Sequence, residues 1–541
     1  MQSRPLKQQL LRISILSFLF LSANIPYLLA QSQTSSYSYY EYQQLNNILY
    51  NLKTRYHTSI KPISLNDTLV YKALDSLSNR FIDTTKKSWV YRKLHNEHLI
   101  QIEKKDFNVY IDFLPDFQVG SDINKRTTWL NTRGYQIQGN IGTKFRFYTS
   151  GYENQSVFPE YLTQYIKSNK IIPGFVNDKF GPSRNTKDWA YASAIINYTA
   201  NKYFSFTLGQ DKNFIGDGYR SMLLSDVAAN YPFFKVETTL GNVKYLNIWA
   251  QFQDLKTPQF SYDNGFRKKW GVFHYLDWNV NNRLSLGFFD AIIWQDADET
   301  AKRGFDVSYL NPLIFLRTVE GANGSPDNAL IGFSGKYKAA KNITLYGQFL
   351  LDEFTASEFF DGNGYWANKF GIQAGFKGFN AFNIKDLNFL AEINTARPYT
   401  YSQRTSLLNY GHYNQPLAHP FGANFRELLS IWNYTYNRWQ VFAQGNFAQY
   451  GLDAAATNSG KDIFKSYKGR TSDYRNFTTQ GIQTNFFYLD GRLSFLINPK
   501  MNLRLEAGAV YRKESNNLGV NSTKWVTFGL RSSIRNIYQD F

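Results

Sequence analysis

From about residue 107 onward, the sequence is built of segments of roughly ten residues in which apolar and polar side chains alternate. A period of two places one kind of side chain on each face of a β-strand. The segments 204–209 and 503–509 show the pattern clearly. In the second of them the polar face carries Arg504 and Glu506, which a dry core would not tolerate unless they were paired. The pattern therefore predicts a wall of strands with one apolar face and one hydrated face.

In the segment 241–255 the alternation assigns each side chain to a face. We expect lipid contacts from Leu246, Ile248, Ala250 and Phe252, and a lumen position for Tyr245, Asn247, Trp249, Gln251 and Gln253. An arginine in place of Leu246 or Ile248 would then impair insertion into a membrane. Bulky inward side chains at Tyr245, Trp249 and Phe442 predict a narrowed lumen.

The composition narrows the class of protein. The chain has 541 residues, of which 43% are hydrophobic and 18% aromatic, and this excludes a disordered chain. It has no cysteine, so a disulfide framework, thiolate metal sites and a cysteine nucleophile are excluded. Beyond the first thirty residues there is no run of about 18 apolar residues, so we expect no membrane-spanning helix.

The first thirty residues have the layout of a signal peptide. A basic stretch precedes the apolar run Ile13–Leu21, and Ala30 offers a cleavage point. We therefore expect residues 1–30 to be removed on export. The loss of three cations would lower the formal net charge from +18 to +15. An exported chain without spanning helices is periplasmic, secreted or an outer-membrane barrel.

The connections between the alternating segments are short and long in turn. Tight turns are expected at Asn201-Lys202, Gly241-Asn242, Asn281-Asn282, Asn437-Arg438 and Pro499-Lys500. Between them lie long linkers such as Phe158–Thr186 and Ala396–Arg426. Short periplasmic turns and long external loops are typical of outer-membrane barrels. We therefore predict an all-β transmembrane fold, an antiparallel outer-membrane β-barrel of about 18 strands over residues 106–541.

Helical spacing marks three other parts of the chain. Leu45 and Leu49 belong to such a pattern in residues 31–105, which we predict to form a small helical domain in the periplasm. Within the barrel region, Pro159–Ser168 and Tyr309–Glu320 also have a helical pattern. We expect these insertions to fold as plug elements that narrow the lumen; the alternative is that they stand outside the barrel as loops.

Several stretches carry a resemblance to a known family. They are Gly209–Ser221, Leu223–Asp226, Tyr231-Pro232-Phe233, Tyr309–Pro312 with Glu320, Tyr410–Pro420, and the neighbourhood of Asn154, Gln155 and Pro159. These stretches are similar to outer-membrane capsule-assembly proteins of the Wzi type, and particularly to the RemB-like proteins of gliding bacteria. The resemblance spans most of residues 105–541. It implies an 18-stranded barrel, occluded by inserted elements, that helps to hold capsular polysaccharide or exopolysaccharide on the cell surface.

Four charged residues form the first candidate ligand-binding group. Asp211, Lys212, Asp217 and Arg220 lie among three glycines. They could bind sugar hydroxyls or an acidic glycan, or they could neutralise one another and hold a plug in place. We favour the second interpretation, because opposite charges close in sequence commonly pair.

The second candidate group is Tyr410, His412, Asn414 and His419. A metal site would need a third protein ligand at a readable spacing, and the sequence offers none, so no metal and no cofactor is predicted. A serine hydrolase would need a nucleophile and a base that the sequence does not bring together, so we do not expect an enzyme. Hydrogen bonding within a folded loop is the favoured role of the two histidines.

Three functions remain open. They are a barrel that attaches or assembles surface polysaccharide, with a link to gliding motility implied by the resemblance, a diffusion channel of the porin kind, and, least favoured, an outer-membrane enzyme. We favour the first, with the linkers Phe158–Thr186 and Ala396–Arg426 outside the barrel as the glycan-holding loops. The expected partners are surface polysaccharide, lipopolysaccharide or other outer-membrane lipid, and envelope proteins bound by the helical domain. Nucleic acid is not expected, because the cations are spread along the chain.

Overall fold

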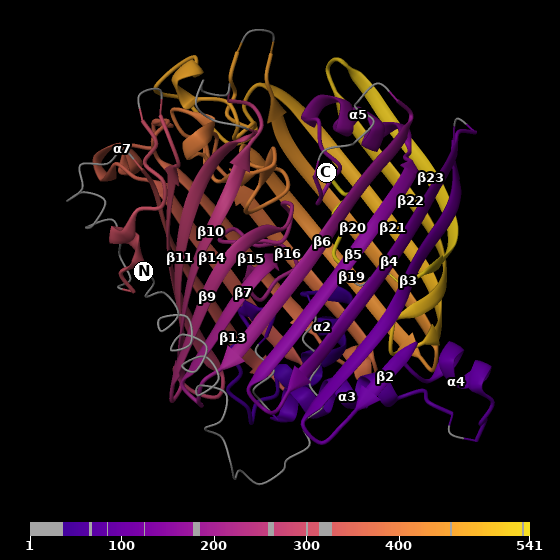
Figure 1. Ribbon diagram of the computed structural model, residues 1–541. Coiled ribbons are helices and arrows are strands. Elements are labelled where there is room, and N and C mark those ends of the chain that lie inside the picture. The colour runs from indigo at the N-terminus through magenta and orange to yellow at the C-terminus, as the bar shows by residue number, and fades with distance from the viewer. Residues whose placement is uncertain are drawn as a thin grey trace, which may run out of the picture.

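The computed structural model of the chain describes residues 36–63, 68–83, 85–123, 125–176, 184–257, 265–298, 301–312, 327–454, 457–532 and 535–541. Its main body is a closed antiparallel β-barrel (Figure 1). Eighteen strands form the closed ring, so the predicted fold class is confirmed. Closure gives each strand of the wall a hydrogen-bonded neighbour on both sides, which a lipid environment requires.

The strands of the ring follow one another in chain order, and each pairs with its neighbours. They are β3 (Phe107–Asp122), β4 (Thr127–Ile141), β5 (Phe145–Val157), β6 (Thr186–Thr199), β7 (Phe204–Asp211), β9 (Tyr231–Leu240), β10 (Val243–Asp254), β11 (Arg267–Asn279), β12 (Leu284–Gln295), β13 (Asn328–Ala340), β14 (Ile343–Glu353), β15 (Lys369–Gly378), β16 (Leu387–Ala396), β19 (Phe425–Tyr436), β20 (Trp439–Leu452), β21 (Ile482–Asn498), β22 (Leu503–Asn516) and β23 (Gly519–Arg531). The ring closes where β23 pairs with β3.

Short and long connections separate to opposite ends of the barrel. The five predicted tight turns all join consecutive wall strands, as Asn281-Asn282 joins β11 to β12. Helix α5 (Glu160–Asn169), in the first of the two long linkers, lies at the other end together with α7 (Ala356–Phe360) (Figure 1). The 3₁₀ segment η4 (Tyr467–Gly469) belongs to the long connection between β20 and β21. A short 3₁₀ segment, η2 (Ala381–Asn383), lies between β15 and β16. Helix α5 confirms the helical pattern of Pro159–Ser168.

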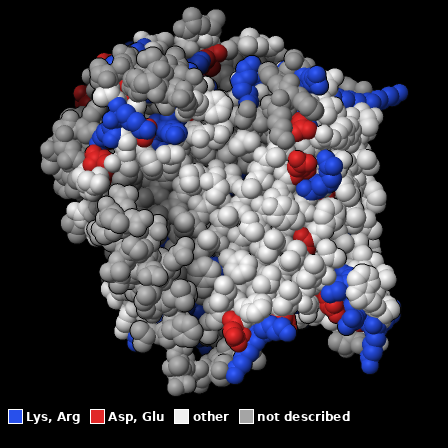
Figure 2. All heavy atoms as spheres, in the orientation of Figure 1, with Lys and Arg blue, Asp and Glu red and all other residues white. Residues whose placement is uncertain are grey.

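The outward side chains of the wall form an apolar band. In β7, Phe204 and Leu208 face outward and are exposed, whereas Ser205 and Thr207 face inward and are buried, as the alternation predicts. Figure 2 shows a broad band of mostly uncharged atoms between charged groups at the two ends. Exposed aromatic rings near the short-turn end are Tyr198, Tyr203, Trp278, Tyr337, Tyr436 and Trp439. An apolar band edged by aromatic rings is the lipid-contacting surface of an outer-membrane barrel, which confirms that location.

The predicted faces of β10 are wrong. Leu246, Ile248 and Phe252 are at most 1% exposed and belong to the apolar core inside the barrel, together with Leu223 and Leu224 of an inserted segment. The prediction assumed a wet lumen, but the plug on this side is apolar, so the inward face of the strand is apolar too. An arginine at Leu246 or Ile248 would therefore disrupt core packing and would not reach lipid.

The outward face of β10 is covered by protein. The Trp249 indole N–H donates to the carbonyl of Tyr309 at 2.8 Å, and the Tyr245 hydroxyl donates to the carbonyl of Pro312 at 2.5 Å. The 3₁₀ segment η1 (Val307–Leu310) and the following Asn311-Pro312 thus lie against the outer wall. Tyr245 and Trp249 do not narrow the lumen, contrary to the prediction. Of the predicted helix at 309–320, residues 313–320 lie outside the described residues.

Two inserted segments form a plug in the lumen, where they pack against the inner faces of wall strands such as β10, β11, β12 and β19. They are residues 212–230, with β8 (Phe214–Ile215), and residues 397–424, with η3 (Ser406–Leu408), β17 (Gly411–His412) and β18 (Gln415–Pro416). The Tyr410 hydroxyl donates to the carbonyl of Leu223 at 2.6 Å, which ties one segment to the other. A Cβ at Gly371 of the wall would lie 2.6 Å from Met222 Cε, so the glycine allows the plug to touch the wall. The expectation that the linker Ala396–Arg426 lies outside is wrong, because Tyr401 and Tyr410 pack in this core.

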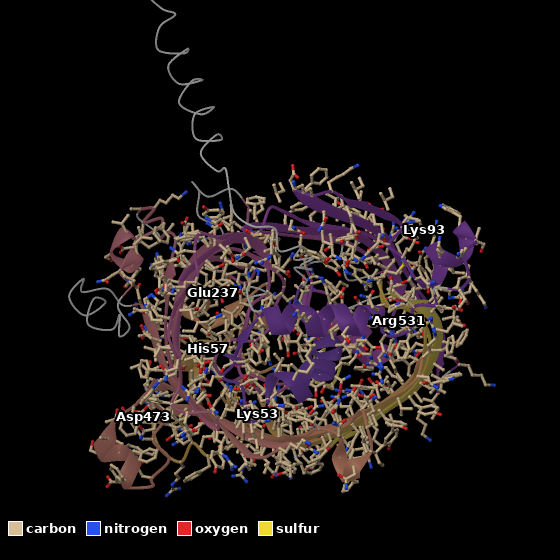
Figure 3. All side chains as sticks on the ribbon, turned by 90° about the horizontal axis from the view of Figure 1, so that it is seen from below. Lys53, His57, Lys93, Glu237, Asp473 and Arg531 are labelled. Carbon is tan, nitrogen blue, oxygen red and sulfur yellow. The ribbon has the colours of Figure 1, made fainter. Side chains whose placement is uncertain are left out.

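The first described residues also lie within the ring, as the view from below shows (Figure 3). They comprise α2 (Tyr39–Leu49) and β1 (Ile60–Lys61), and β1 pairs with β8 of the plug. Then come α3 (Thr68–Asn79), α4 (Trp89–His95) and β2 (Ile100–Glu103). No helix among the described residues is long and apolar enough to cross a membrane. A separate periplasmic domain over 31–105 stays a prediction, and the signal peptide lies outside the described residues.

The orientation of β20 gives a test of the wall. Phe447 faces outward at 45% exposure beside Leu428 and Phe487, whereas Gln444 faces the lumen and donates to Asp540. Phe447→Arg should block insertion, because a cation facing lipid near the midplane costs about 2–4 kcal/mol. Gln444→Arg should insert, since Asp540 can accept its charge. Heat-dependent gel mobility of outer-membrane fractions measures both, and equal insertion of the two variants would contradict the assigned faces.

Candidate functional site

Asp211, the first predicted site residue, binds residues near both ends of the described chain. Asp211 accepts hydrogen bonds from Ser36 Oγ at 2.5 Å and from Arg535 Nη1 at 3.0 Å. The neighbouring Lys212 donates to two backbone carbonyls, including that of Gly174 at 2.9 Å. Burial lowers the pKa of Lys212 to about 8. Both side chains are therefore used in contacts between segments of the protein.

Asp217 anchors the N-terminal segment to the plug. Its carboxylate accepts hydrogen bonds from the Tyr50 hydroxyl at 2.6 Å and from Thr58 Oγ1 at 2.5 Å. Burial opposes the charged form, but the wall cations Lys336 and Lys377 lie close and hold the pKa of Asp217 well below its ordinary value. The carboxylate of Asp217 is thus ionised, and the positive charges of the nearby lysines balance its negative charge.

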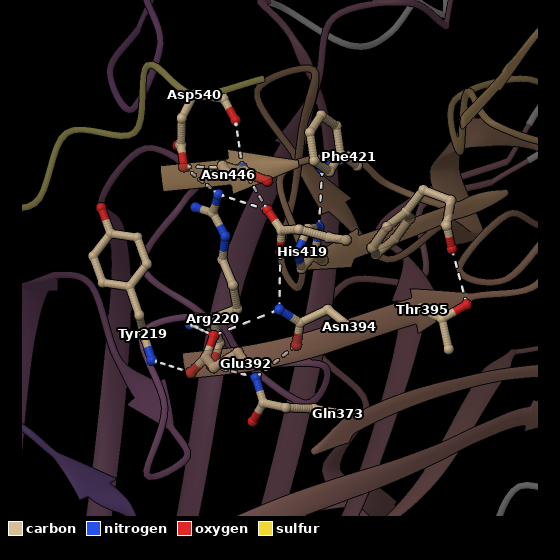
Figure 4. A network of polar contacts seen from close by, with 12 residues as sticks. Tyr219, Arg220, Gln373, Glu392, Asn394, Thr395, His419, Phe421, Asn446 and Asp540 are labelled. Carbon is tan, nitrogen blue, oxygen red and sulfur yellow. Dashed lines mark hydrogen bonds and ion pairs between the residues drawn. The ribbon is translucent and has the colours of Figure 1, made fainter. Parts of the chain in front are cut away.

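Arg220 is the centre of a buried polar network (Figure 4). Its guanidinium bonds Glu427 at 3.0 Å and also pairs with Asp540, and its side chain is fully buried. The backbone N–H groups of Tyr219 and Arg220 donate to Glu392 of β16 at 2.6 and 3.2 Å. This network joins the plug segment 212–230 to the wall and to the last residues of the chain.

The second predicted group lies in the plug segment 397–424. His419 Nε2 is 2.7 Å from Glu427 Oε2, so this histidine extends the Arg220 network. His412 Nδ1 accepts from the backbone N–H of Gln253 at 3.0 Å, and burial lowers the pKa of His412 to about 3, which keeps it neutral. Asn414 donates to the carbonyl of Asn169 in α5 at 2.9 Å. These hydrogen bonds join the plug segment to wall strands and to α5, whereas the predicted hydrogen bonds were within a single folded loop.

Seven of the eight predicted residues therefore lie in the plug, Asp211 ends the wall strand β7, and all eight bond to other parts of the chain. A ligand-binding role for these residues stays a prediction. Their contacts within the protein already explain where their side chains lie. Among the described residues no group of three or more histidines and carboxylates is placed to hold a metal ion.

A cleft at the long-loop end offers a different candidate site. Its volume is about 420 Å³, and it opens where five separate parts of the chain meet. They are α5, the plug residues 414–422, the end of β20 with Asp453 and residues 461–464, the tops of β22 and β23, and Phe541.

Half-buried aromatic rings form part of the cleft. Tyr165 of α5 and Phe541 have ring centroids 4.3 Å apart, and Phe464 lines the cleft as well. Aromatic faces of this kind offer apolar surfaces to the C–H groups of a sugar, while a tyrosine hydroxyl can still hydrogen-bond.

Charged groups surround these rings. Lys461 Nζ lies 4.7 Å from the centroid of the Tyr450 ring, and burial lowers the pKa of Lys461. Arg512 Nη2 pairs with Glu514 at 2.9 Å, and Asp462 also lines the cleft. Carboxylates accept hydrogen bonds from hydroxyl groups and the cations attract acidic groups, so the cleft has the polar groups that a charged glycan needs.

Sequence reasoning found parts of this cleft but not the cleft itself. The predicted site residue Asn414 lines it, and so does Tyr165, which lies in the linker Phe158–Thr186 that we expected to hold glycan. Lys461 was not predicted, and it is almost three hundred residues from Tyr165 in the chain. The helical pattern of Pro159–Ser168 correctly places Tyr165 on a helix at the long-loop end. The partners of Tyr165 are set by strand order, which a local pattern does not reveal.

The Arg220 network gives a test of the plug. Arg220→Met should lower the free energy of unfolding by about 3–5 kcal/mol, because two buried carboxylates would lose their cation. The control is Arg133→Met, whose pair with Glu153 spans 3.7 Å between exposed side chains and contributes at most about 1 kcal/mol. Denaturant titration of the refolded barrels measures both. Equal stability of the two variants would show that the network does not hold the plug.

Comparison with known proteins places the fold. No family profile matches the chain, and no curated protein matches it either. Among solved structures, the chain is similar to Wzi, an outer-membrane protein of Escherichia coli described as a carbohydrate-binding β-barrel involved in group 1 capsule assembly. That match has a TM-score of 0.54 and 12% sequence identity, and it covers 91% of this chain and 97% of Wzi. OprD of Pseudomonas aeruginosa matches with a TM-score of 0.41 and 8% identity over 78% of this chain and 94% of OprD. The likeness to Wzi shows that the two chains share an outer-membrane barrel fold.

Proposed function

We propose that this protein attaches surface polysaccharide to the outer membrane, and that the cleft at the long-loop end holds the glycan. The cleft carries the proposal, because it combines aromatic faces with buried and half-buried charges on the side where the long loops lie. No catalytic role is proposed. The proposal includes a link to gliding motility, which the sequence resemblance implies. We assign no residue to that link.

The filled lumen supports attachment over transport. The plug and the N-terminal segment occupy the ring. Two lumen cavities, one lined mainly by β19–β22 and one by β3–β6 and β21–β23, have volumes of only about 100 and 120 Å³. Phe442, predicted to point inward, lines the first of them. Open porins leave a continuous aqueous channel, so an occluded barrel suits a protein that holds its ligand on one side.

The comparison with Wzi also supports the proposal. That barrel is described as carbohydrate-binding, and it shares the fold over almost the whole of this chain.

Conductance separates attachment from diffusion. Purified protein in planar bilayers should give no steady current, because the Arg220 network fixes the plug. Removing that anchor in Arg220→Met should produce flickering openings. A large and steady current through the unmodified protein would instead favour a diffusion channel.

Glycan binding tests the cleft directly. The double variant Tyr165→Ala/Phe464→Ala should weaken the binding of purified cell-surface polysaccharide roughly tenfold, since an aromatic contact contributes about 0.5–1.5 kcal/mol and 1.4 kcal/mol is a factor of ten. Titration calorimetry on the detergent-solubilised barrel measures the affinity.

The matched control is Tyr474→Ala. Tyr474 is an exposed loop tyrosine, 45% accessible, and it does not line the cleft. This variant should bind like the unmodified protein. If the control loses as much affinity as the double variant, or if neither variant loses any, then the cleft does not hold the glycan.

A further inference from the structure

A second surface of unusual composition lies at the short-turn end. In α4, Trp89 and Val90 are 63% and 64% exposed, and Leu94 is 48% exposed. No residue of this helix is buried. Strand β2 follows after four residues, and Ile100 and Ile102 are exposed as well. So many large apolar side chains in one short stretch mark a contact surface. We call the exposed apolar side chains of α4 and β2 the foot.

The foot continues the lipid-facing band of the barrel. Strand β2 pairs with the lower part of β3, so that Ile100 lies opposite Ile111 and Ile102 lies opposite Val109. Ile111 and Val109 alternate with the buried Tyr110 and therefore face outward. Ile100 and Ile102 share that outward face, because directly opposed residues of a sheet lie on the same side.

Strand β2 occupies a gap in the wall. The closing pair of β23 with β3 extends only from Phe117 to Asp122 on β3, whereas β3 pairs with β4 from Phe107 to Ser121. The lower edge of β3 is thus left to β2. The apolar residues of β2 extend the band where the ring closes.

Helix α4 lies to the side of the barrel. Figure 1 shows it beyond the wall at the lower right, and Figure 3 places Lys93 outside the ring. The helix is held there by Asn498 of β21, whose side-chain amide donates to the carbonyls of Lys93 and Glu97 at 3.1 and 3.0 Å. A helix fixed beside the short-turn rim lies at the level where the lipid headgroups meet the wall.

Cations flank the apolar side chains. Lys86 and Lys87 are exposed just before α4, and Arg92 is exposed within it. Lysines and arginines beside exposed tryptophan and aliphatic residues are typical of helices that lie in the membrane interface, where the cations face phosphate groups.

We propose that the foot inserts into the periplasmic leaflet of the outer membrane and binds anionic phospholipid at its edge. Trp89, Val90 and Leu94 would enter the boundary between headgroups and acyl chains, in line with Ile100 and Ile102. Lys86 and Lys87 would contact lipid phosphates. The foot would shield the short β23–β3 seam from the periplasm.

Single-cysteine labelling tests the foot, because the chain has no cysteine of its own. Leu94→Cys and Trp89→Cys would each carry an environment-sensitive fluorophore, in full-length protein inserted into vesicles of phosphatidylethanolamine and phosphatidylglycerol. Lipids with a spin label on the acyl chain near the headgroup serve as quenchers. Leu208→Cys on the outward face of β7 is the lipid-exposed reference, and Lys53→Cys is the water-exposed reference.

Both foot labels should be quenched as strongly as the label at Leu208→Cys, and the label at Lys53→Cys should respond only to iodide in the buffer. Replacing phosphatidylglycerol with phosphatidylcholine should weaken the quenching of the foot labels and leave the reference at Leu208→Cys unchanged. Iodide quenching of both foot labels without quenching by lipid would overturn the proposal. The foot would then be a docking surface for a periplasmic protein. Because this result depends on no glycan, it is independent of the proposed attachment function.

Discussion

Closure of the wall is the constraint on which the rest of this structure depends. In a bilayer each strand must satisfy its backbone hydrogen bonds within the protein, and eighteen strands meet that demand by forming a ring. A ring of this size encloses a lumen too wide for its own side chains to fill. The protein fills it with chain: residues 36–61, 212–230 and 397–424 pack inside. Buried ion pairs such as Arg220 with Glu427 then fix these segments in one position.

The same constraint explains what the sequence could predict and what it could not. In β7 and β22 the inner face meets polar groups, so alternation gives the right faces for Leu208 and Glu506. In β10 both faces meet protein, and the apolar Ile248 points toward an apolar plug. A local pattern cannot tell lipid from a plug, since both select apolar side chains. The strand count and the tight turns depend only on local signals, and they were predicted correctly.

The candidate sites follow the same division. The glycine-rich run with Asp217 and Arg220 was recognisable in sequence, and its favoured role as a plug-fixing network agrees with the contacts of both residues. The linker that contains Tyr410 was expected outside the barrel. It belongs to the core instead, because its aromatic residues pack against Leu223 and the wall. The cleft near Tyr165 depends on the meeting of five distant segments, which only the closed ring brings together. If the proposed glycan attachment holds, the fixed plug leaves the rim of the barrel, and not its lumen, for a long glycan.

Footprinting of aromatic side chains tests this account most directly. Hydroxyl radicals would modify the vesicle-inserted barrel with and without purified surface polysaccharide, and mass spectrometry would locate the modified rings. The account predicts that the polysaccharide protects Tyr165, Phe464 and Phe541, and leaves the loop residue Tyr474 and the lumen residue Phe442 unchanged. Protection of Phe442 together with the other lumen rings would contradict it, because the glycan would then pass through the barrel that we describe as closed.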